Sequence, residues 1–356
     1  MKKKVIFIGI IALVGIVVTL LAPILFTRGL TQYDFTETGE IGDTIGGITA
    51  PIIGILSVIF LIWTLWEQID FNKKQKNISI DEQFKSTFFN LLQVQRDIVN
   101  KISGKFTYVS KKDVTHIVTI KSNGLDFFSQ ARYQLFLIFK SLDNNKYING
   151  YNDTNAQYAE SDIENTWYRD YGGSDLPYDI EAMWNNYSNN TRMVHIIAYT
   201  SDLFGISKKG HENYQSLSIN KQIGLGYAYF FNKYETIGYY FRHLYYILKF
   251  IKKNEDDKIH SLGDNPNQAE MEKIRNEYNL YAQFIQAQMS TDELLMAFYN
   301  SFAYPKAQYL IIHYNLLENL TIQNLIKTEH NCKPEIRLKD RRNVFTDLIN
   351  NHDNTN

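Results

Sequence analysis

Two uncharged stretches near the start constrain this chain more than any other feature. Val5–Phe26 and Ile45–Trp66 are each 22 residues long and contain no Asp, Glu, Lys or Arg. At about 1.5 Å per residue, a helix of that length rises roughly 33 Å, which is enough to cross a hydrocarbon core of about 30 Å. The pattern predicts a transmembrane hairpin over residues 1–66, with the lipid bilayer as its partner.

Two other interpretations of these runs are weaker. A cleaved secretory leader has an apolar core of only about 7–15 residues and a small-residue cleavage site, and no such site follows Phe26. A buried hairpin of a soluble protein would not need the charge pattern that flanks both runs. Transmembrane helices therefore remain the prediction.

The flanking charges predict how the hairpin is oriented. Three lysines occupy positions 2–4, and Lys73, Lys74 and Lys76 follow the second run. The connector 27–43 holds one arginine and four acidic residues. Because Lys and Arg favour the cytoplasmic side, we expect both termini in the cytoplasm, a short acidic loop outside, and a multi-pass protein of the bacterial inner membrane. The second lysine group can also attract anionic lipid.

The second run contains small residues at a spacing of four: Gly46, Ala50 and Gly54. These residues share one helix face and would allow another membrane helix to approach closely. We expect this face to be used in helix packing, within the hairpin or in a homo-oligomer.

The rest of the chain predicts a mainly α protein. Apolar residues at three-to-four spacing indicate a cytoplasmic helical bundle over residues 67–328, and a polar tail that frays over 329–356. Alternation between Tyr108 and Ile120 suggests a small β-hairpin. Three signals indicate where helices start or stop: a capping-box spacing at Ser79 and Glu82, which starts a helix near Ile80 that stops at Gly104, a second capping-box spacing at Ser290 and Glu293, and Pro305 in a first turn. Apolar periodicity predicts the other helices, at Leu125–Leu142, Arg192–Leu203, Phe230–Ile251 and Met271–Ile285.

Composition and motif searches exclude several kinds of site. There is no phosphate-binding GxxxxGK[ST], no GxGxxG, no HExxH and no GxSxG. A single cysteine, Cys332, excludes an intrachain disulfide and a thiolate zinc cluster. The net charge of −1 gives no sign of nucleic-acid binding. We therefore expect no metal, no cofactor and no nucleic-acid partner, and we assign the abundant Tyr and Phe to a helical core.

The first candidate site is the adjacent pair Arg242 and His243. An arginine beside a histidine can stabilise a phosphate and transfer a proton. Neighbouring helix residues point about 100° apart, however, so a pair facing other helices or water is the simpler interpretation. Helical ribonuclease toxins often carry an Arg, four to six residues and then a His; no arginine in this chain has that spacing, and Arg192 and His195 lie too close together.

The second candidate is a polar cluster of Gln288, Ser290, Glu293 and Asn300. Helix capping explains Ser290 and Glu293 by itself. Asn300 would then satisfy buried backbone groups. The alternative is a ligand or partner site formed by Gln288, Glu293 and Asn300.

Several segments follow one another in a characteristic order behind the first apolar run: Gly42–Pro51, Phe88–Leu92, Tyr240–Tyr245, Ile247–Ile251, Ala287–Leu294 and Phe298–Asn300. This set resembles that of the phage abortive-infection proteins of the AbiC-like family, over residues 40–320. One departure is Met289, where the family pattern would have Leu; that exchange preserves apolar volume. The resemblance does not extend to residues 143–225.

The resemblance implies anti-phage defence in a bacterium, in which an infected cell stops growing or dies before phage mature. It implies no catalytic residues. The first functional hypothesis is a non-enzymatic membrane effector, whose cytoplasmic bundle senses a phage-derived trigger or partner and whose hairpin then perturbs the membrane. The alternatives are a membrane-tethered ribonuclease acting through Arg242 and His243, and an envelope scaffold protein without enzymatic activity.

Overall fold

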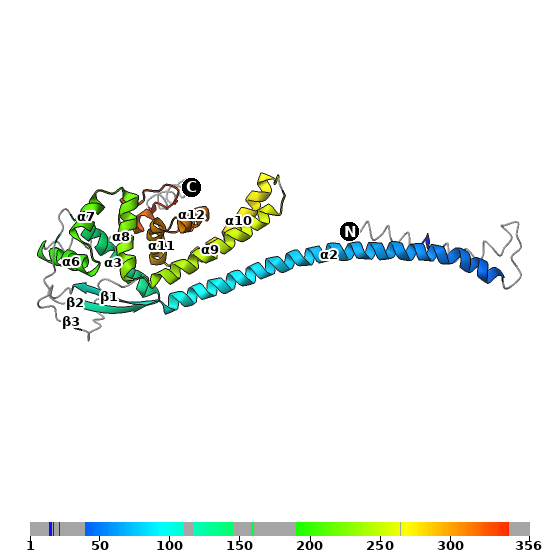
Figure 1. Ribbon diagram of the computed structural model, residues 1–356, viewed down its shortest axis with the longest axis horizontal. Helices are drawn as coiled ribbons and strands as arrows, with labels where there is room; N and C mark the ends of the chain where they lie inside the picture. Colours follow the sequence, from blue (N-terminus) through cyan, green and yellow to red (C-terminus); the bar gives the residue numbers. More distant parts are fainter. Residues whose placement is uncertain are drawn as a thin grey trace, which may run out of the picture. The chain divides into compact units, whose positions relative to one another are not determined.

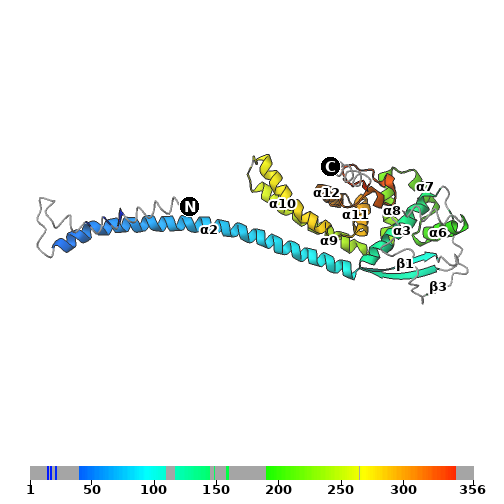
Figure 2. The same ribbon diagram turned by 180° about the vertical axis from the view of Figure 1, so that it is seen from behind.

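The computed structural model describes residues 40–109, 117–144, 190–263 and 265–341, and a few isolated positions. The protein is mainly α, as predicted (Figures 1 and 2). Two compact units divide the chain, residues 1–85 and 86–356. The elements are α2 (Glu40–Lys101), β1 (Ser103–Val109), β2 (Ile117–Asn123), α3 (Leu125–Asp143), β3 (Tyr158–Ala159), α6 (Asn190–Leu203), α7 (Lys208–Gln215), α8 (Ile219–Lys233), α9 (Ile237–His260), α10 (Gln268–Gln286), α11 (Thr291–Ala303), α12 (Pro305–His313) and the short helices η2 (Ile322–Asn324) and η3 (Thr328–His330).

Helix α2 is longer than the sequence predicts. It continues for 62 residues, so the expected helix end at Trp66 and new start near Ile80 are both wrong. The intervening stretch Glu67–Ser79 contains neither Gly nor Pro. Because the backbone meets no breaker there, a helical turn continues through the capping-box residues Ser79 and Glu82. The helix ends at Lys101, and Gly104 lies in β1 rather than at a helix stop.

One helix in the described part of the chain is long and apolar enough to cross a bilayer. Within Ile53–Lys101, an 18-residue window has a mean hydropathy of 1.5, and none of that window is buried. Length and composition alone make this a weak hint of membrane association. Of the other predicted span, residues 5–26, only Val14, Gly15, Val17 and Leu21 are described, so the two-helix hairpin remains a prediction.

The expected packing face and the observed close approach lie at different places in the first unit. A Cβ atom added to Gly46 or Gly54 would meet nothing within 4 Å. At Gly15, by contrast, an added Cβ would lie 2.6 Å from Leu56 Cδ1. Gly15 thus permits contact with α2, whereas the Gly46, Ala50 and Gly54 face is open.

The predicted β-hairpin is present. Strands β1 and β2 pair antiparallel with Phe106 opposite Ile120, and two residues of β3 add a short parallel edge. The loop 110–116 lies outside the described residues. Phe106, Tyr108 and Ile120 are buried, so one face of the hairpin joins the core.

The core of the second unit is built around α3. This helix packs against α6, α8, α11 and both long strands. Phe128, Leu135 and Phe139 are fully buried. Gly226 on α8 fits directly against Phe139: a Cβ there would lie 2.4 Å from Phe139 Cε1, so only glycine lets the two helices approach this closely.

The apolar stripe over Phe230–Ile251 is divided between two helices. Helix α8 ends at Lys233, and Tyr234 leaves the helical region with φ −121° and ψ 50°. The apolar pattern continues across the end of α8, because Phe230, Tyr234 and Ile237 are all buried in the same core. Helices α9 and α10 then pack side by side as a helical hairpin (Figures 1 and 2).

The two local signals at α11 and α12 are confirmed. Ser290 and Glu293 form a reciprocal capping box, with Glu293 N donating to Ser290 Oγ at 3.2 Å and Ser290 N donating to Glu293 Oε2 at 2.8 Å. Pro305 occupies the first turn of α12, where its missing N–H leaves no bond unmade.

Replacing Ser290 with Ala should lower the free energy of unfolding by about 1 kcal/mol, because Glu293 N loses its acceptor. Ser218 is the matched control: it precedes α8 as the N-cap residue, but its side chain makes no capping hydrogen bond. Urea titrations of the full chain in detergent micelles compare the two variants. Equal effects at Ser290 and Ser218 would contradict the capping assignment.

The predicted fraying of the C-terminal tail is wrong for residues 329–341. His330 and Ile336 are 3 % and 4 % exposed. Tyr299 places its hydroxyl 2.7 Å from His330 Nδ1, and Lys327 pairs with Asp143. The segment is polar in sequence, yet its few apolar and aromatic side chains are sufficient to hold it on the core.

His330 should make stability depend on pH. Burial, helped by the charge of Lys327, lowers the pKa of His330 from an ordinary 6.5 to about 3. Since protonation then favours the unfolded chain, the contribution is complete above pH 6.5 and is lost as the pH falls toward 3, at about 1.4 kcal/mol per pH unit. His330→Gln keeps an acceptor for the Tyr299 hydroxyl and does not titrate.

Between pH 6.5 and pH 5, we therefore expect the wild-type free energy of unfolding to fall by about 2 kcal/mol more than that of His330→Gln. Urea titrations of both chains at the two pH values measure the difference. Parallel losses in the two proteins would refute the role of His330.

Candidate functional site

Arg242 and His243 lie beside one groove, although they are neighbours on a helix. The groove has a volume of about 530 Å³ and is lined by the end of α2, the start of β1 and the first turns of α9. Lys101 and Tyr239 also contribute to it. The Arg242 guanidinium lies 5.6 Å from the centre of the Tyr239 ring. The two side chains therefore face one common space, which the 100° helical offset did not suggest.

His243 is held by Gln95 of α2. Nδ1 of His243 lies 2.7 Å from Gln95 Oε1. An amide oxygen only accepts, so Nδ1 carries the hydrogen and Nε2 keeps a lone pair. Burial lowers the pKa of His243 below its ordinary value. At neutral pH this imidazole is therefore uncharged and able to accept a proton.

Gln95 also lines a second, smaller cavity of about 240 Å³. Its walls come from α2, α9, α10 and the start of α11, and they include Gln288 and Glu293. Arg96 Nε donates to Gln288 Oε1 at 2.7 Å, which joins α2 to the residues that follow α10. Gln95 thus lies between the groove at His243 and this cavity.

Three buried polar side chains gather at the cavity. Gln95, Tyr240 and Glu293 are 7 %, 1 % and 2 % exposed. Within the described part of the chain, Gln95 Nε2 has no hydrogen-bond partner, and the Tyr240 hydroxyl lies close enough to Glu293 and Gln95 to interact with both. Burial raises the pKa of Glu293 and outweighs its hydrogen bonds with Ser290 and Tyr240, and burial together with the Glu293 carboxyl raises the pKa of Tyr240. Such a cluster has spare donors in a low-dielectric setting.

Asn300 is not part of this cavity. Its Oδ1 accepts a hydrogen bond from the Tyr227 hydroxyl at 2.9 Å, so it joins α11 to α8 within the core. The structure therefore brings Gln288 and Glu293 together and leaves Asn300 elsewhere. Gln95 and Tyr240, which complete the polar cluster, were not identified from the sequence, because nothing local marks a buried Gln or Tyr as unusual.

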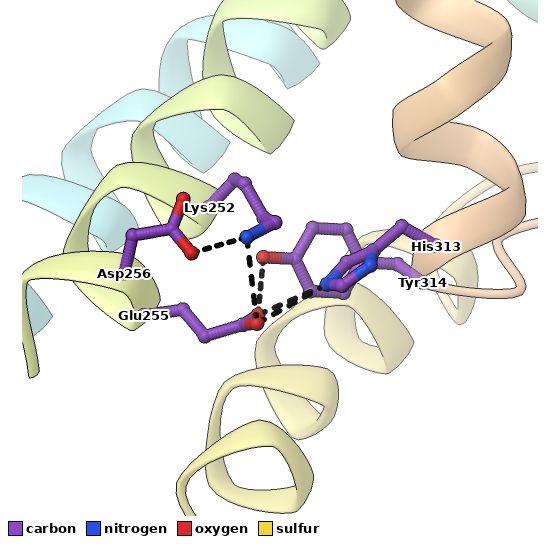
Figure 3. A network of polar contacts seen from close by, with 5 residues as sticks. All are labelled: Lys252, Glu255, Asp256, His313 and Tyr314. Atoms are coloured by element: carbon purple, nitrogen blue, oxygen red, sulfur yellow. Dashed lines mark hydrogen bonds and ion pairs between the residues drawn. The ribbon is translucent and has the colours of Figure 1, made fainter. Parts of the chain in front are cut away.

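A second polar network joins α9 to α12 (Figure 3). It was not predicted from the sequence. The Glu255 carboxylate is 1 % exposed. It accepts from the Tyr314 hydroxyl at 2.8 Å and lies 3.2 Å from His313 Nε2 and 3.7 Å from Lys252 Nζ. Lys252 also pairs with Asp256.

This network keeps the buried carboxylate of Glu255 ionised. Burial by itself would raise the pKa of Glu255, but the hydrogen bonds from His313 and Tyr314 and the positive charge of Lys252 outweigh it, and the pKa is lowered. Glu255 is thus ionised and fully partnered. One feature of the sequence could have indicated that Glu255 is buried. It follows Leu248 and Ile251 at helical spacing and so lies on the apolar face of α9.

Among the described residues, no group of three His, Cys, Asp or Glu side chains is placed to hold a metal ion. Cys332 Sγ donates to Asn220 Oδ1 at 2.8 Å, and burial raises the pKa of its thiol. A raised pKa lowers the thiolate fraction, so this cysteine is not an activated nucleophile.

Part of the chain matches a protein-family model. The model described as "Putative phage abortive infection protein" matches residues 232–325. Neither a curated protein nor a solved structure matches the chain. The matched segment contains α9 to α12 and with them Arg242, His243, Glu255 and Glu293. Over residues 232–325, the resemblance of this chain to the phage abortive-infection family is therefore confirmed.

Proposed function

We propose that this chain is a membrane-associated anti-phage defence protein, in which the helical unit 86–341 detects infection and the N-terminal segments perturb the bilayer. The observation that carries the proposal is the match of residues 232–325 to an abortive-infection family, which suggests a phage-defence role. The absence of a motif for a cofactor-dependent enzyme in the sequence fits a binding or effector role.

The membrane part of the proposal draws on the first unit. No part of the apolar window of α2 is buried, whereas the core helix of a soluble protein would be mostly buried. Gly15 lies against Leu56, which is the close contact that a two-helix hairpin requires. The flanking lysines would then place both termini in the cytoplasm. A homo-oligomer could use the open face at Gly46, Ala50 and Gly54.

Membrane potential in infected cells tests this mechanism. Cells that carry the protein should lose their potential after phage infection and before lysis, as read with a potential-sensitive dye, while cells without the protein keep it until lysis. Growth arrest at an unchanged potential would overturn the membrane-perturbing mechanism. Equal phage plating with and without the protein would overturn the defence role and favour an envelope scaffold.

A ribonuclease is the second candidate, and it rests on the shared groove of Arg242 and His243. Nε2 of His243 would accept the proton of a ribose 2′-hydroxyl as that oxygen attacks phosphorus. Arg242 would stabilise the negative charge that develops, and water would protonate the leaving 5′-oxygen. Lys101 at the same groove would help to hold the phosphate backbone.

Alanine replacements separate the two candidates. A ribonuclease requires that Arg242→Ala with His243→Ala abolishes both RNA cleavage and phage protection. Lys273→Ala with Arg275→Ala is the matched control, because both residues are exposed on α10 and lie outside the groove. Full protection by the Arg242 and His243 variant would eliminate the ribonuclease.

A further inference from the structure

A third hollow lies between α9 and the start of α12. It has a volume of about 620 Å³, within the range of about 300–1,000 Å³ that is typical of small-ligand sites. All of its lining residues fall within the family-matched segment and belong to neither the His243 groove nor the Gln95 cavity. We call it the lysine groove, after Lys249, Lys252, Lys253 and Lys306 in its wall.

The wall of the lysine groove has a net positive charge, with four lysines and two aspartates. Lys252 is neutralised by Asp256 and by the buried Glu255. Lys249, Lys253 and Lys306 form no ion pair with a carboxylate in the described part of the chain. Asp257 is the other acid in the wall. Three lysines without an ion pair thus line the groove from two helices, which favours a ligand with more than one negative charge.

The walls of the groove are held in place by buried polar contacts. Glu255 on α9 accepts from Tyr314 and contacts His313, both at the end of α12 (Figure 3). Because this network joins the two helices that carry the lysines, the helix backbones need no rearrangement for a ligand to bind. A preorganised backbone limits the entropic cost of binding to the ordering of the exposed lysine side chains.

Two tyrosines add a second kind of recognition. Tyr245 and Tyr309 line the groove, and Tyr309 is 59 % exposed. The Tyr309 ring stacks on His313 at 6.0 Å with an interplanar angle of 25°, which restrains its orientation. An exposed aromatic face of this kind stacks on planar rings.

We propose that the lysine groove is a binding site for a nucleoside polyphosphate, with the phosphates on Lys249, Lys253 and Lys306 and the planar base on Tyr309. The groove combines separated cationic groups with an aromatic surface, and a nucleotide presents the complementary charge and ring within one molecule. This inference deepens the proposed function, because a nucleotide would be the signal that the helical unit detects. The binding itself does not depend on that function.

ATP is the probe, titrated by calorimetry into the full chain in detergent micelles. ATP should bind the wild-type chain, and Lys249→Glu with Lys253→Glu should weaken binding by about tenfold or more, because two charge-assisted contacts become repulsive. Lys306→Ala should weaken it from the opposite wall. Lys273→Glu with Arg275→Glu on α10 is the matched control, since it makes the same change of charge at two exposed positions outside the groove. All the replaced lysines are exposed, so the fold should tolerate them.

Pyrophosphate, which lacks the base, separates the contribution of the lysines from that of Tyr309. Tyr309→Ala should weaken ATP binding and leave pyrophosphate binding unchanged. The proposal is overturned if ATP does not bind, if the paired charge reversal leaves its affinity unaltered, or if a single-stranded decathymidylate binds far more tightly than ATP, which would indicate a nucleic-acid surface instead.

The binding result and the defence result can fail separately. A chain that binds ATP through these lysines but gives no phage protection supports the site and refutes the proposed function. Protection by a chain that does not bind ATP refutes the site and leaves the proposed function standing.

Discussion

Arginine at positions 55 and 61 is expected to prevent the apolar segment of α2 from spanning the membrane and to abolish phage protection. Ile55 and Leu61 are 61 % and 63 % exposed on the apolar part of α2. In lipid, each arginine near the middle of a spanning helix costs about 2.5–3.5 kcal/mol of insertion free energy. In water, the same changes would replace exposed apolar side chains and leave localisation and function intact.

The experiment compares the protease accessibility of the C-terminus in spheroplasts and the phage plating of Ile55→Arg with Leu61→Arg against a matched pair on the same helix. Gln75→Arg with Asn77→Arg adds the same charge at exposed polar positions beyond the apolar window. The control pair should keep a C-terminus that external protease does not reach and should protect normally against phage. If the C-terminus of the Ile55 and Leu61 variant is equally inaccessible and the variant protects like the wild type, the apolar segment does not span a bilayer.

Removing the Glu255 carboxylate should cause the largest loss of stability of any single change at the α9–α12 junction. Glu255→Ala leaves the Tyr314 hydroxyl without its acceptor and Lys252 and His313 without their shared buried anion. Breaking a buried charged network by deleting one partner lowers the free energy of unfolding by about 3–5 kcal/mol. Urea titration of the full chain measures the loss.

Asp256→Ala provides the comparison on the neighbouring residue. Asp256 also pairs with Lys252, but its side chain is 46 % exposed. An exposed ion pair contributes only about 0.2–1 kcal/mol, so this variant should be nearly as stable as the wild type. A similar loss in both variants would mean that the burial of Glu255 does not govern its contribution.

Local signals predicted local structure well in this chain. The capping box at Ser290 and Glu293 and the first-turn Pro305 are confirmed, because each depends on residues within one helical turn. The amphipathic run Leu125–Leu142 corresponds to α3, which ends one residue later. The predicted helix start near Ile80 was wrong although the same kind of signal is present there. A capping-box spacing at Ser79 does not begin a helix, because no breaker precedes it.

The candidate sites could be predicted only in part. The sequence singled out His243, yet its partner Gln95 lies 148 residues away and belongs to another helix. It singled out Glu293 as a cap, yet burial is what raises the pKa of its carboxyl above the ordinary value, against the lowering effect of the hydrogen bonds from Ser290 and Tyr240. Asn300 looked like a site residue and is a core contact with Tyr227. Hydrogen bonds between helices depend on how those helices pack, and periodicity does not specify that.

The sequence by itself determined the helical class, most helix positions, the apolar segments and the family resemblance. The helical class, the helix positions and the apolar segments follow from composition and from spacing over a few residues, which act before the chain is packed, and the resemblance rests on the order of the matching segments. Tertiary structure alone decided the length of α2, the packing of residues 329–341, the shared groove of Arg242 and His243, the ionised Glu255 network and the lysine groove. Each of these depends on burial and on charges from distant helices, because desolvation and long-range contacts set the chemistry of a side chain only once the core has formed.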